Sequence, residues 1–391
     1  MKIVYLSTDF KPNSGGVAEL AYQVCAQLAI RGHEVTVVTE VAKRFDPQIY
    51  DRFQVERVFD PYPLPGVRSF RGFFRVIAWR RRTVRQMRDA ILRCNPNMVL
   101  AGNYHGLWIK VLPGLRVPYA LFLHGEDVAG LMRTVVFRHR RWDMVRVLRN
   151  AGWVFCNTTY SRALVKQIIG RYERASVVGC GYPVEGIVER PLRQEARARL
   201  GWDDAPVILT VARLIFRKGI DTTLKALPEI LKHWPSCRYV IVGEGADRAE
   251  LEHLAGDLGL AGCVSFTGFI SDDLKRDIYA ASDIYVMPSR PGSHGETEGF
   301  GISYLEANAL GLPVIGSVAG GIPDAVGDRE NGLLVEPGDS VGLAQALLML
   351  LRDPEMRQRM AIEGQQRIRE RFNWVKIVEQ MEPRLLEASR R

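Results

Sequence analysis

Residues 1–40, MKIVYLSTDFKPNSGGVAELAYQVCAQLAIRGHEVTVVTE, contain the pattern from which the architecture of this chain is predicted. Apolar runs, a glycine-containing loop and an apolar stripe of helical spacing predict strand, loop, helix and strand in turn, over residues 3–7, 12–16, 20–32 and 34–39. Strands that alternate with helices favour a parallel sheet covered by helices, because each parallel connection must cross over the sheet.

The same alternation continues along the chain. In the N-terminal half, further strands are predicted at 98–101, 119–123 and 154–157. From Val207 onward, strands are predicted at 207–211, 238–242, 264–267, 284–287 and 313–317. Helices are predicted between and after these strands, at 222–233, 248–258, 272–280, 302–310, 341–352, 355–371 and from about residue 374.

Two domains account for this pattern. The length of 391 residues suits two α/β domains of roughly 150–200 residues each. The segment 179–191 is rich in glycine and proline and is the best candidate for a linker. We therefore expect the α/β fold class, with two Rossmann-like doubly wound domains over residues 1–183 and 184–372, and an active site in the cleft between them.

Composition indicates an ordinary globular protein of the cytoplasm, with 47% hydrophobic residues. No signal-peptide pattern follows Met1, and the apolar stretch 341–351 is far shorter than the roughly 20 residues of a membrane helix. The six cysteines show no C-x-x-C spacing, which favours reduced thiols over disulfides or a zinc site.

The formal net charge of +9 is concentrated in two arginine-rich segments, Arg68–Arg93 and Arg133–Arg149. The first also contains Phe70, Phe73, Phe74, Ile77 and Trp79, and a mixture of cations and aromatics is typical of proteins that bind an anionic membrane surface. A solvated helix face packed on a core is the equally weighted alternative. No nucleic-acid partner is expected, because no recognition motif accompanies the charge.

Ligands of open α/β sheets bind beyond the carboxyl ends of the strands, so the residues that follow each predicted strand are candidates. Gly15 and Gly16 precede a helix after the first strand, where the backbone could approach an anion or simply form a tight turn. His124 and Gly125 follow the strand 119–123. His124 could donate to a substrate hydroxyl, although a structural histidine is the alternative.

Two cations follow the strand 207–211. Arg213 offers a guanidinium fork and Lys218 a point charge, a combination that suits a pyrophosphate group. The alternative is a pair of solvated surface cations. Gly243 and Gly245 follow the next strand, and this pair alone is a weak signal that also occurs in turns.

The sharpest motif is Glu298-Gly299-Phe300-Gly301, with Glu306 further along. Two carboxylates at this spacing would lie up to roughly 12 Å apart along a helix. Each could accept from two adjacent hydroxyls, as sugar and ribose diols offer, while the glycines expose backbone N–H groups. A helix-dipole role for Glu298 and a solvated position for Glu306 are the alternatives.

Neither a D-x-D nor an H-E-x-x-H motif is present, so we expect no metal and no cofactor besides a nucleotide-sugar donor. Arg213 and Lys218 would neutralise the leaving diphosphate instead.

In combination and order, these motifs resemble those of the family 4 retaining glycosyltransferases with the GT-B fold. The resemblance covers nearly the whole chain and extends to Gly320-Gly321-Ile322-Pro323-Asp324 and Asn331-Gly332-Leu333-Leu334-Val335. It implies a hexosyltransferase whose N-terminal domain faces the acceptor and whose C-terminal domain binds the donor. It also implies that the last helix, 373–391, crosses back to complete the N-terminal domain.

The resemblance further implies a role for each matched residue. Arg213 and Lys218 would bind the donor pyrophosphate, and Glu306 would hold the ribose. Glu298 would hold the transferred sugar and His124 would contact it near its C6 hydroxyl, so that both serve catalysis by positioning and electrostatics. The other donor-binding positions would be Gly16, Gly243, Gly245, Ile270, Gly299, Phe300 and Gly301.

The loop 289–297 is longer than in the shortest family pattern and resembles that of bacterial phosphatidylinositol mannoside mannosyltransferases. This favours GDP-mannose as donor over UDP-hexoses, and a lipid-linked or polysaccharide-precursor hydroxyl as acceptor at the inner face of the membrane. The acceptor-binding candidates are Asp9, Tyr104, His105 and Asp127.

Two other functions are compatible with the same fold. One is another enzyme class, such as a nucleotide-sugar epimerase or a phosphorylase. The other is a non-catalytic homologue that only binds nucleotide sugar.

Overall fold

The computed structural model describes residues 1–13, 15–41, 52–60, 70–103, 107–125, 129, 138–170, 172–184, 187, 191–293 and 295–390. The chain divides into two compact units, each treated by itself below. Unit 1 comprises Met1–Gly179 with Trp374–Arg391, and unit 2 comprises Cys180–Asn373. In the parts of the chain that the structure describes, no helix combines the length and apolar character needed to cross a bilayer.

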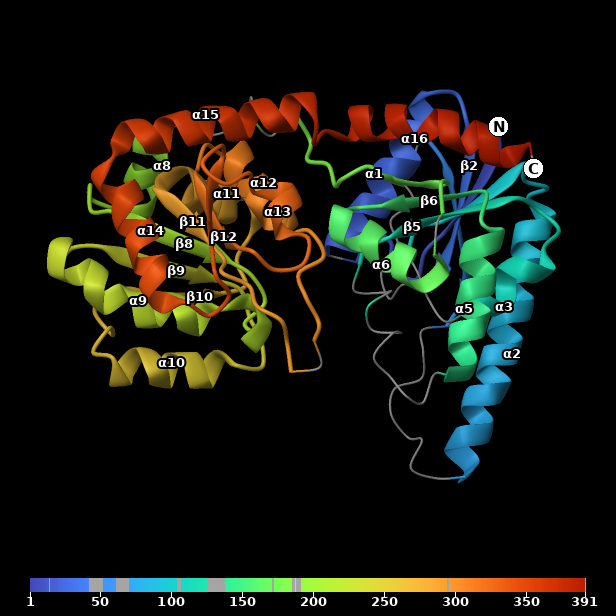
Figure 1. Ribbon diagram of the computed structural model, residues 1–391, viewed down its shortest axis with the longest axis horizontal. Helices are drawn as coiled ribbons and strands as arrows, with labels where there is room; N and C mark the ends of the chain where they lie inside the picture. Colours follow the sequence, from blue (N-terminus) through green and yellow to red (C-terminus); the bar gives the residue numbers. More distant parts are fainter. Residues whose placement is uncertain are drawn as a thin grey trace. The chain divides into compact units, whose positions relative to one another are not determined.

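Unit 1 is built on a parallel sheet whose described strands follow the order β3-β2-β1-β4-β5-β6-β7. Figure 1 labels β2, β5 and β6 of this sheet. The strands are β1 (Lys2–Leu6), β2 (Glu34–Glu40), β3 (Gln54–Phe59), β4 (Met98–Ala101), β5 (Tyr119–Leu123), β6 (Trp153–Cys156) and β7 (Ala175–Val177). The helices are α1 (Gly16–Ile30), α2 (Phe70–Arg93), α3 (Trp108–Val111), the short 3-10 turn η2 (Leu112–Gly114), α5 (Arg138–Asn150), α6 (Thr159–Ile169) and α16 (Trp374–Ser389).

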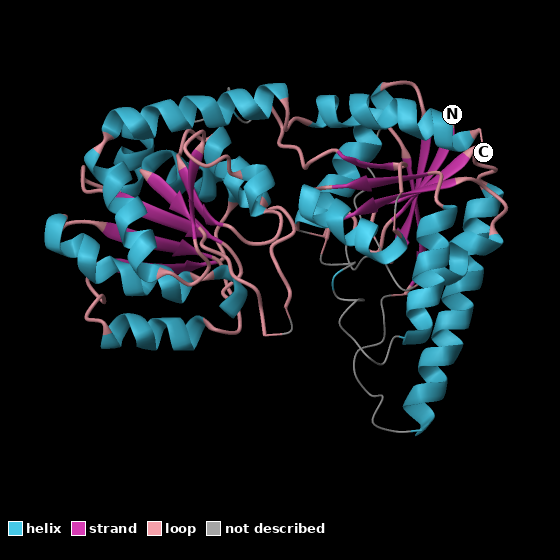
Figure 2. Cartoon of the chain, viewed as in Figure 1, coloured by secondary structure: helices cyan, strands magenta, loops and turns pink. Residues whose placement is uncertain are grey.

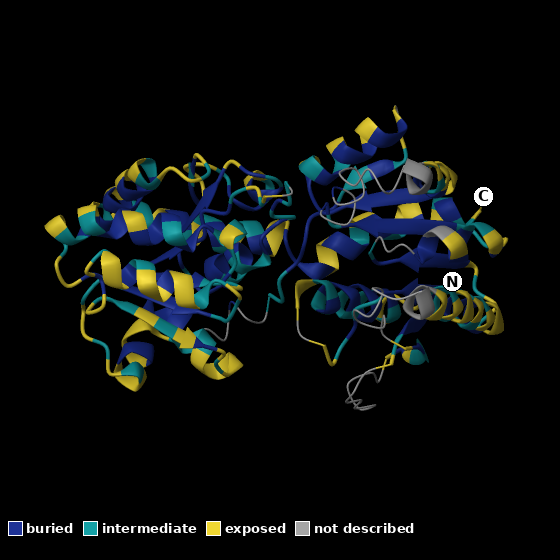
Figure 3. Cartoon of the chain, turned by 90° about the horizontal axis from the view of Figure 1, so that it is seen from below, coloured by how far each residue is buried: buried dark blue, intermediate teal, exposed yellow. Residues whose placement is uncertain are grey.

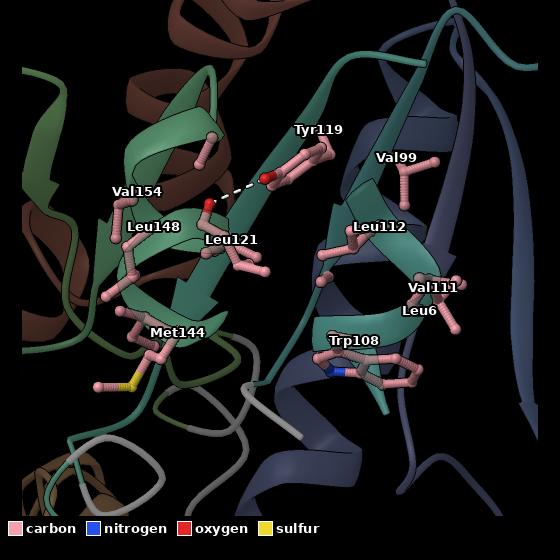
Figure 4. Close-up of a cluster of buried hydrophobic side chains, with 14 of the residues drawn as sticks. Leu6, Val99, Trp108, Val111, Leu112, Tyr119, Leu121, Met144, Leu148 and Val154 are labelled. Atoms are coloured by element: carbon pink, nitrogen blue, oxygen red, sulfur yellow. Dashed lines mark hydrogen bonds between the residues drawn. The ribbon is translucent and has the colours of Figure 1, made fainter. Parts of the chain in front are cut away.

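The core of unit 1 lies between this sheet and the helices that cover it. Figure 4 shows apolar side chains from β4, β5, α3 and α5 packed together, with Trp108 and Leu121 fully buried. Tyr119 keeps its hydroxyl satisfied in this environment by donating to the Val147 carbonyl at 2.8 Å. A sheet covered on both faces explains why the strands are continuous apolar runs.

The C-terminal helix α16 belongs to unit 1, where it packs on α1, β5 and β6. The helix approaches so closely that a Cβ atom added to Gly152 would lie 2.7 Å from the Ala388 Cβ. Elsewhere on α16, the Glu382 carboxylate contacts the segment that follows α1. It accepts from Arg31 Nε at 2.7 Å and lies 2.9 Å from His33 Nε2. Packing and an ion pair therefore both fix the returning helix.

Unit 2 contains a second parallel sheet, whose described strands follow the order β10-β9-β8-β11-β12-β13. Figure 2 draws the strands of both sheets in magenta and the helices in cyan. The strands are β8 (Val207–Val211), β9 (Arg238–Val242), β10 (Val264–Gly268), β11 (Ile284–Val286), β12 (Val314–Ser317) and β13 (Gly332–Val335). The helices are α8 (Arg193–Leu200), the 3-10 turn η4 (Phe216–Lys218), α9 (Ile220–His233), α10 (Arg248–Asp257), α11 (Asp272–Ala281), α12 (Ile302–Ala309), α13 (Ile322–Ala325), α14 (Ser340–Arg352) and α15 (Pro354–Glu370).

Local sequence signals account for several helix starts. The side chains of Thr158, Ser271 and Asp339 accept hydrogen bonds from backbone N–H groups in the first turns of α6, α11 and α14. Such caps satisfy donors that a helix leaves free at its N-terminus. Figure 3 shows how burial is distributed, with buried strands and exposed outer helix faces.

The α/β prediction is confirmed, and the predicted strands agree with the structure to within about one residue at their ends. Three strands were missed: β3, β7 and β13. β7 has only three residues, β13 offers only three consecutive apolar residues after a glycine, and β3 carries two charged residues in six, so none contains a long apolar run.

Replacement of Glu382 by glutamine should weaken the attachment of α16. Burial alone would raise the pKa of the Glu382 carboxyl, but hydrogen bonds from Arg31 and His33 lower it below its ordinary value. We expect Glu382→Gln to reduce the free energy of unfolding by about 1 kcal/mol at pH 7, a value discounted for the partial exposure of Arg31. Urea denaturation would measure it.

The expected loss depends on pH. Because the folded-state pKa is depressed, the stabilisation is present above the ordinary carboxyl pKa and disappears as pH falls below it. The difference between wild type and variant should therefore shrink from about pH 5 downward. Glu379→Gln is the control, since Glu379 lies 3.8 Å from the same arginine. An equal loss in both variants would contradict a specific role for Glu382.

Candidate active site

The strand order of unit 2 places a candidate ligand site beyond the ends of two neighbouring strands, β8 and β11. The chain leaves β8 toward β9 and β10 on one side, and β11 begins the other half on the opposite side of β8. Open α/β sheets bind ligands at this reversal, beyond the carboxyl ends of the strands. Arg213 and Lys218 follow β8, and Glu298 follows β11, so the sheet brings both loops to the same edge.

The centre of the site is a carboxylate held by two cations. Lys218 Nζ lies 2.5 Å from Glu298 Oε2, and Arg217 Nη1 lies 3.2 Å from the same oxygen. The three side chains are nearly buried, with exposed fractions of 12%, 11% and 13% for Lys218, Arg217 and Glu298. The arrangement is therefore an ion cluster shielded from most solvent, not a set of solvated surface charges.

The cations determine the charge of Glu298. Burial alone would raise the pKa of its carboxyl, but Lys218 and then Arg217 outweigh this effect and lower the pKa below its ordinary value. Arg213 acts in the same direction from a more exposed position. Glu298 is thus an anion at neutral pH.

Two glycines allow the loops to come this close. Gly219 has φ 69°, and a Cβ there would lie 2.1 Å from the Pro288 carbonyl oxygen in the loop after β11. Gly320 has φ 56°, and a Cβ there would lie 2.4 Å from the Glu298 carbonyl oxygen. The N–H of Gly321 donates to that same oxygen at 2.9 Å. The Gly320-Gly321 motif therefore supports the backbone of Glu298.

Arg217 was missed by sequence reasoning, which selected Arg213 and Lys218 as the cation pair. Arg217 adjoins Lys218 in the 3-10 turn η4, which directs both side chains to Glu298. The available signal was its position directly before Lys218 in the loop after a strand.

The glycines after β9 support the Arg213 loop. A Cβ on Gly243 would lie 2.0 Å from the Ala212 carbonyl oxygen, and one on Gly245 would lie 2.0 Å from that of Leu214. Ala212 and Leu214 flank Arg213, so the two glycines allow the loop that carries Arg213 to pack closely against the end of β9. Ile270 is half-buried after β10, next in the sheet.

Helix α12 carries the second acidic residue. Gly301 is its N-cap, with φ 85°, and a Cβ there would lie 2.5 Å from the ring of Tyr304. Glu306 is half-buried in the second turn, where Tyr279 donates its hydroxyl to Oε2 at 3.1 Å. Gly299 is half-buried beside Glu298. The side chain of Phe300 is buried, with its ring 5.6 Å from that of Phe372, so it packs in unit 2.

A buried amide pair links α12 to the segment that precedes β13. Asn331 Nδ2 donates to Asn308 Oδ1 at 2.6 Å, and Asn308 Nδ2 donates to the Leu312 carbonyl at 2.9 Å. A Cβ on Gly364 of α15 would lie 2.6 Å from Asn308. The Asn331-Gly332 motif therefore has a structural role in locating the helix that carries Glu306.

Unit 1 has a comparable reversal between β1 and β4. Asp9 follows β1, and its Oδ1 accepts from Asn13 Nδ2 at 3.0 Å. Gly16 is the first residue of α1. His124 follows β5 and its Nε2 lies 2.8 Å from the Gly102 carbonyl oxygen, which can only accept, so the proton is on Nε2. The candidates Tyr104, His105 and Asp127 lie outside the described residues.

Two family models match the chain. The one described as "Glycosyl transferases group 1" matches residues 193–367, and "Glycosyltransferase Family 4" matches residues 14–185. Together they span parts of both units.

Several curated proteins are similar over much of the chain. A "GDP-mannose-dependent monoacylated alpha-(1-6)-phosphatidylinositol monomannoside mannosyltransferase" of Corynebacterium glutamicum is 36% identical over 276 residues, which are 67% of this chain and 72% of that protein. A related mannosyltransferase of Mycolicibacterium smegmatis, "GDP-mannose-dependent alpha-(1-6)-phosphatidylinositol monomannoside mannosyltransferase", is 28% identical over 390 residues, 95% of each chain.

Solved structures share the fold. Sucrose-phosphate synthase from Thermosynechococcus elongatus superposes with a TM-score of 0.81 and 25% identity, covering 99% of both chains. An Anabaena protein solved with UDP and glucose superposes with a TM-score of 0.76 and 23% identity, again covering 99% of both chains.

Replacement of Lys218 should lower the free energy of unfolding, because Glu298 would lose one of the two cations that contact it. Lys218→Met keeps an aliphatic side chain but leaves a nearly buried carboxylate with only one close cation. We expect a loss of about 2 kcal/mol in the free energy of unfolding, below the roughly 3–5 kcal/mol of fully buried pairs because Arg217 still contacts the carboxylate. Urea denaturation at pH 7 would measure it.

The triple variant Arg217→Met/Lys218→Met/Glu298→Gln should recover most of that stability, because it removes all three charges of the cluster together. The exposed Arg213, replaced by glutamine, is the matched control and should change stability by less than about 0.5 kcal/mol. A triple variant that is less stable than Lys218→Met would contradict the electrostatic interpretation.

Proposed function

This chain belongs to glycosyltransferase family 4, with the GT-B fold, and we propose that it transfers mannose from GDP-mannose, with retention, to a hydroxyl of a lipid-linked or polysaccharide-precursor acceptor. The observation that carries the proposal is the cluster of Lys218, Arg217 and Glu298 at the strand reversal of unit 2. It combines positive charge for a diphosphate with a carboxylate for sugar hydroxyls.

The relatives support the donor. Both mannosyltransferases cited above are described as GDP-mannose-dependent, and one matches 95% of this chain. Nucleotide-sugar use follows from family membership, while mannose and guanine are the finer part of the proposal. UDP-hexoses are the alternative donors.

The cation cluster suits a leaving diphosphate. During transfer, the bond from sugar C1 to the diphosphate oxygen breaks, a bond from C1 to the acceptor oxygen forms, and the acceptor proton passes to the departing phosphate. Arg213, Arg217 and Lys218 would stabilise the negative charge that develops on the diphosphate. Because these side chains supply the charge, the proposed reaction requires no divalent metal.

The same cluster gives Glu298 a positioning role. Its carboxylate contacts two cations, Lys218 and Arg217. When phosphate oxygens bind Lys218, the carboxylate would lose part of its contact with that lysine. It could then accept hydrogen bonds from sugar hydroxyls instead. Glu306, held by the Tyr279 hydroxyl, would bind the ribose. In this proposal neither carboxylate attacks C1, and the departing phosphate assists the incoming hydroxyl on the same face.

Unit 1 would provide substrate contacts through the ends of β1 and β5. His124 donates its Nε2 proton to the Gly102 carbonyl, which orients its ring at the end of β5. In this proposal the ring contacts the transferred sugar. Asp9 offers a half-exposed carboxylate after β1. Gly16 begins α1, where an N-terminus favours an anionic group.

Binding to an anionic membrane, from the cytoplasmic side, would bring a lipid-linked acceptor to the enzyme. On α2, Arg75, Arg81, Arg82 and Arg85 are exposed and recur on one helix face with the 55%-exposed Phe74. Trp142 on α5 is 79% exposed. Exposed aromatics among cations fit an anionic lipid surface. Arg68 and Arg133, and the side chains of Phe70, Phe73 and Arg138, lie outside the described residues.

Loss of either member of the ion cluster should abolish transfer. Lys218→Ala and Glu298→Ala should each lower kcat/KM for GDP-mannose at least about 100-fold, the order of magnitude lost with one transition-state charge stabiliser. The assay follows labelled mannose from GDP-mannose into an organic-extractable acceptor, with and without EDTA. Lys232→Ala, an exposed lysine of α9, is the control and should keep wild-type activity.

Near-normal turnover in both site variants would contradict the proposal. Loss of wild-type activity in EDTA, with recovery on addition of a divalent metal, would contradict the part of the proposal that requires no metal. Conversion of the sugar nucleotide without acceptor would indicate an epimerase. Donor binding without transfer across a panel of acceptors would indicate a non-catalytic homologue.

Neutralisation of the α2 face should weaken membrane binding. Wild-type protein should float with liposomes that contain anionic phospholipid at low salt, and the triple variant Arg81→Gln/Arg82→Gln/Arg85→Gln should float much less, since each cation near such a surface contributes about 1 kcal/mol. The control replaces Lys232, Arg359 and Arg369, which are exposed in unit 2. Equal flotation of both triple variants would refute a role for this face.

A further inference from the structure

Arg290, in the loop between β11 and α12, makes contacts that the functions assigned above do not use. Its guanidinium forms two bonds to one carboxylate, from Nη2 to Asp221 Oδ1 at 2.7 Å and from Nη1 to Asp221 Oδ2 at 3.0 Å. The same group lies over the ring of Phe216, 3.7 Å from its centroid. Arg290 and Asp221 are 14% and 19% exposed, so this is not a solvated surface pair.

These contacts join the loop after β11 to the loop after β8. Phe216 is the first residue of η4, the turn that also contains Arg217 and Lys218. Asp221 lies in the first turn of α9, directly after η4 and Gly219. Arg290 therefore contacts the chain on both sides of the two cations that hold Glu298.

The backbone reinforces the same connection. The N–H of Arg290 donates to the Arg217 carbonyl at 2.8 Å. Two residues earlier, the Pro288 carbonyl oxygen would lie 2.1 Å from a Cβ at Gly219, so only a glycine fits there. Side-chain and main-chain contacts thus place one short segment of the β11 loop against the whole of η4.

We propose that Arg290, through Asp221 and Phe216, is a positioning residue that holds Arg217 and Lys218 in the geometry needed to bind the donor diphosphate. Its guanidinium contacts Asp221 and Phe216, and its backbone N–H donates to the Arg217 carbonyl, so it would act on the diphosphate through these residues. This inference rests on the proposed function of the ion cluster, and adds a specific cause for its geometry.

Arginine is required for this task by its shape. A planar guanidinium can bind a carboxylate with two parallel bonds and stack on an aromatic ring at the same time, while a lysine ammonium can do neither. Lys225 also reaches Asp221 Oδ2, at 3.3 Å, but from an exposed position on α9 itself. It cannot join the two loops.

The test measures binding of the diphosphate separately from binding of the nucleoside. Calorimetry is carried out on the full chain with GDP and UDP, and with guanosine and uridine, and the tighter diphosphate is used for comparison. In Arg290→Gln and Asp221→Asn, the Kd of the diphosphate should rise at least about tenfold, since small misplacements of binding groups can cost as much as roughly 100-fold. Nucleoside affinity should stay unchanged.

Two further variants complete the test. Arg290→Gln/Asp221→Asn should be no weaker than Arg290→Gln alone if the two residues act together. Arg290→Lys should not restore affinity. Arg199→Gln is the matched control, because Arg199 makes the same two-bonded contact with Asp277, at 2.9 and 2.6 Å, in another part of unit 2. It should bind as wild type does.

Wild-type diphosphate affinity and kcat/KM in Arg290→Gln would overturn the inference. An equal fall in nucleoside and diphosphate affinity would also overturn it, since that result indicates a general loss of structure. If Arg290→Gln does not fold, Phe216→Leu removes the ring alone and should produce the same selective loss. Lys218→Ala distinguishes failure of the proposed function from failure of this inference. If Lys218→Ala keeps wild-type diphosphate affinity, the ion cluster does not bind the diphosphate. If Lys218→Ala lowers that affinity and Arg290→Gln does not, only the positioning role of Arg290 is wrong.

Discussion

The negative charge of Glu298 can be maintained in a nearly buried position only because two cations contact it. Much of the surrounding structure serves that contact. Gly219 lets the β8 loop touch Pro288, Gly320 lets another loop approach the Glu298 carbonyl, and Arg290 joins the segment before α12 to η4. An ion cluster of this kind stabilises little by itself, so its value lies in the charges that it presents at one defined place.

The same residues are suited to an exchange of partners. In the unliganded protein, Glu298 balances Lys218 and Arg217. In the proposed reaction, an incoming diphosphate would bring its own negative charge to those cations, and sugar hydroxyls would bring donors to the carboxylate. The diphosphate and the sugar would each replace part of the contact between Glu298 and the two cations.

Sequence reasoning located the strands of unit 2 and the residues at their carboxyl ends, because apolar runs and glycine-rich loops are local signals. It did not distinguish Arg217 from Arg213, since the choice depends on η4 being a 3-10 turn that aims neighbouring side chains at the same carboxylate. It gave Arg290 no role, because its partners Asp221 and Phe216 lie about 70 residues earlier and meet it only through parallel pairing of β8 with β11. Pairings between distant strands are not encoded in any short window.

The return of α16 to unit 1 has a consequence for synthesis of the chain. Unit 2 is inserted between the main part of unit 1 and its last helix, since the chain leaves unit 1 at Gly179 and re-enters at Trp374. On the ribosome, β5 and β6 must wait with part of their apolar surface uncovered until unit 2 has been made and the C-terminus has been released. Unit 2 can therefore complete its fold before unit 1 does. A chain that ends before α16 would leave unit 1 without the helix that covers β5 and β6.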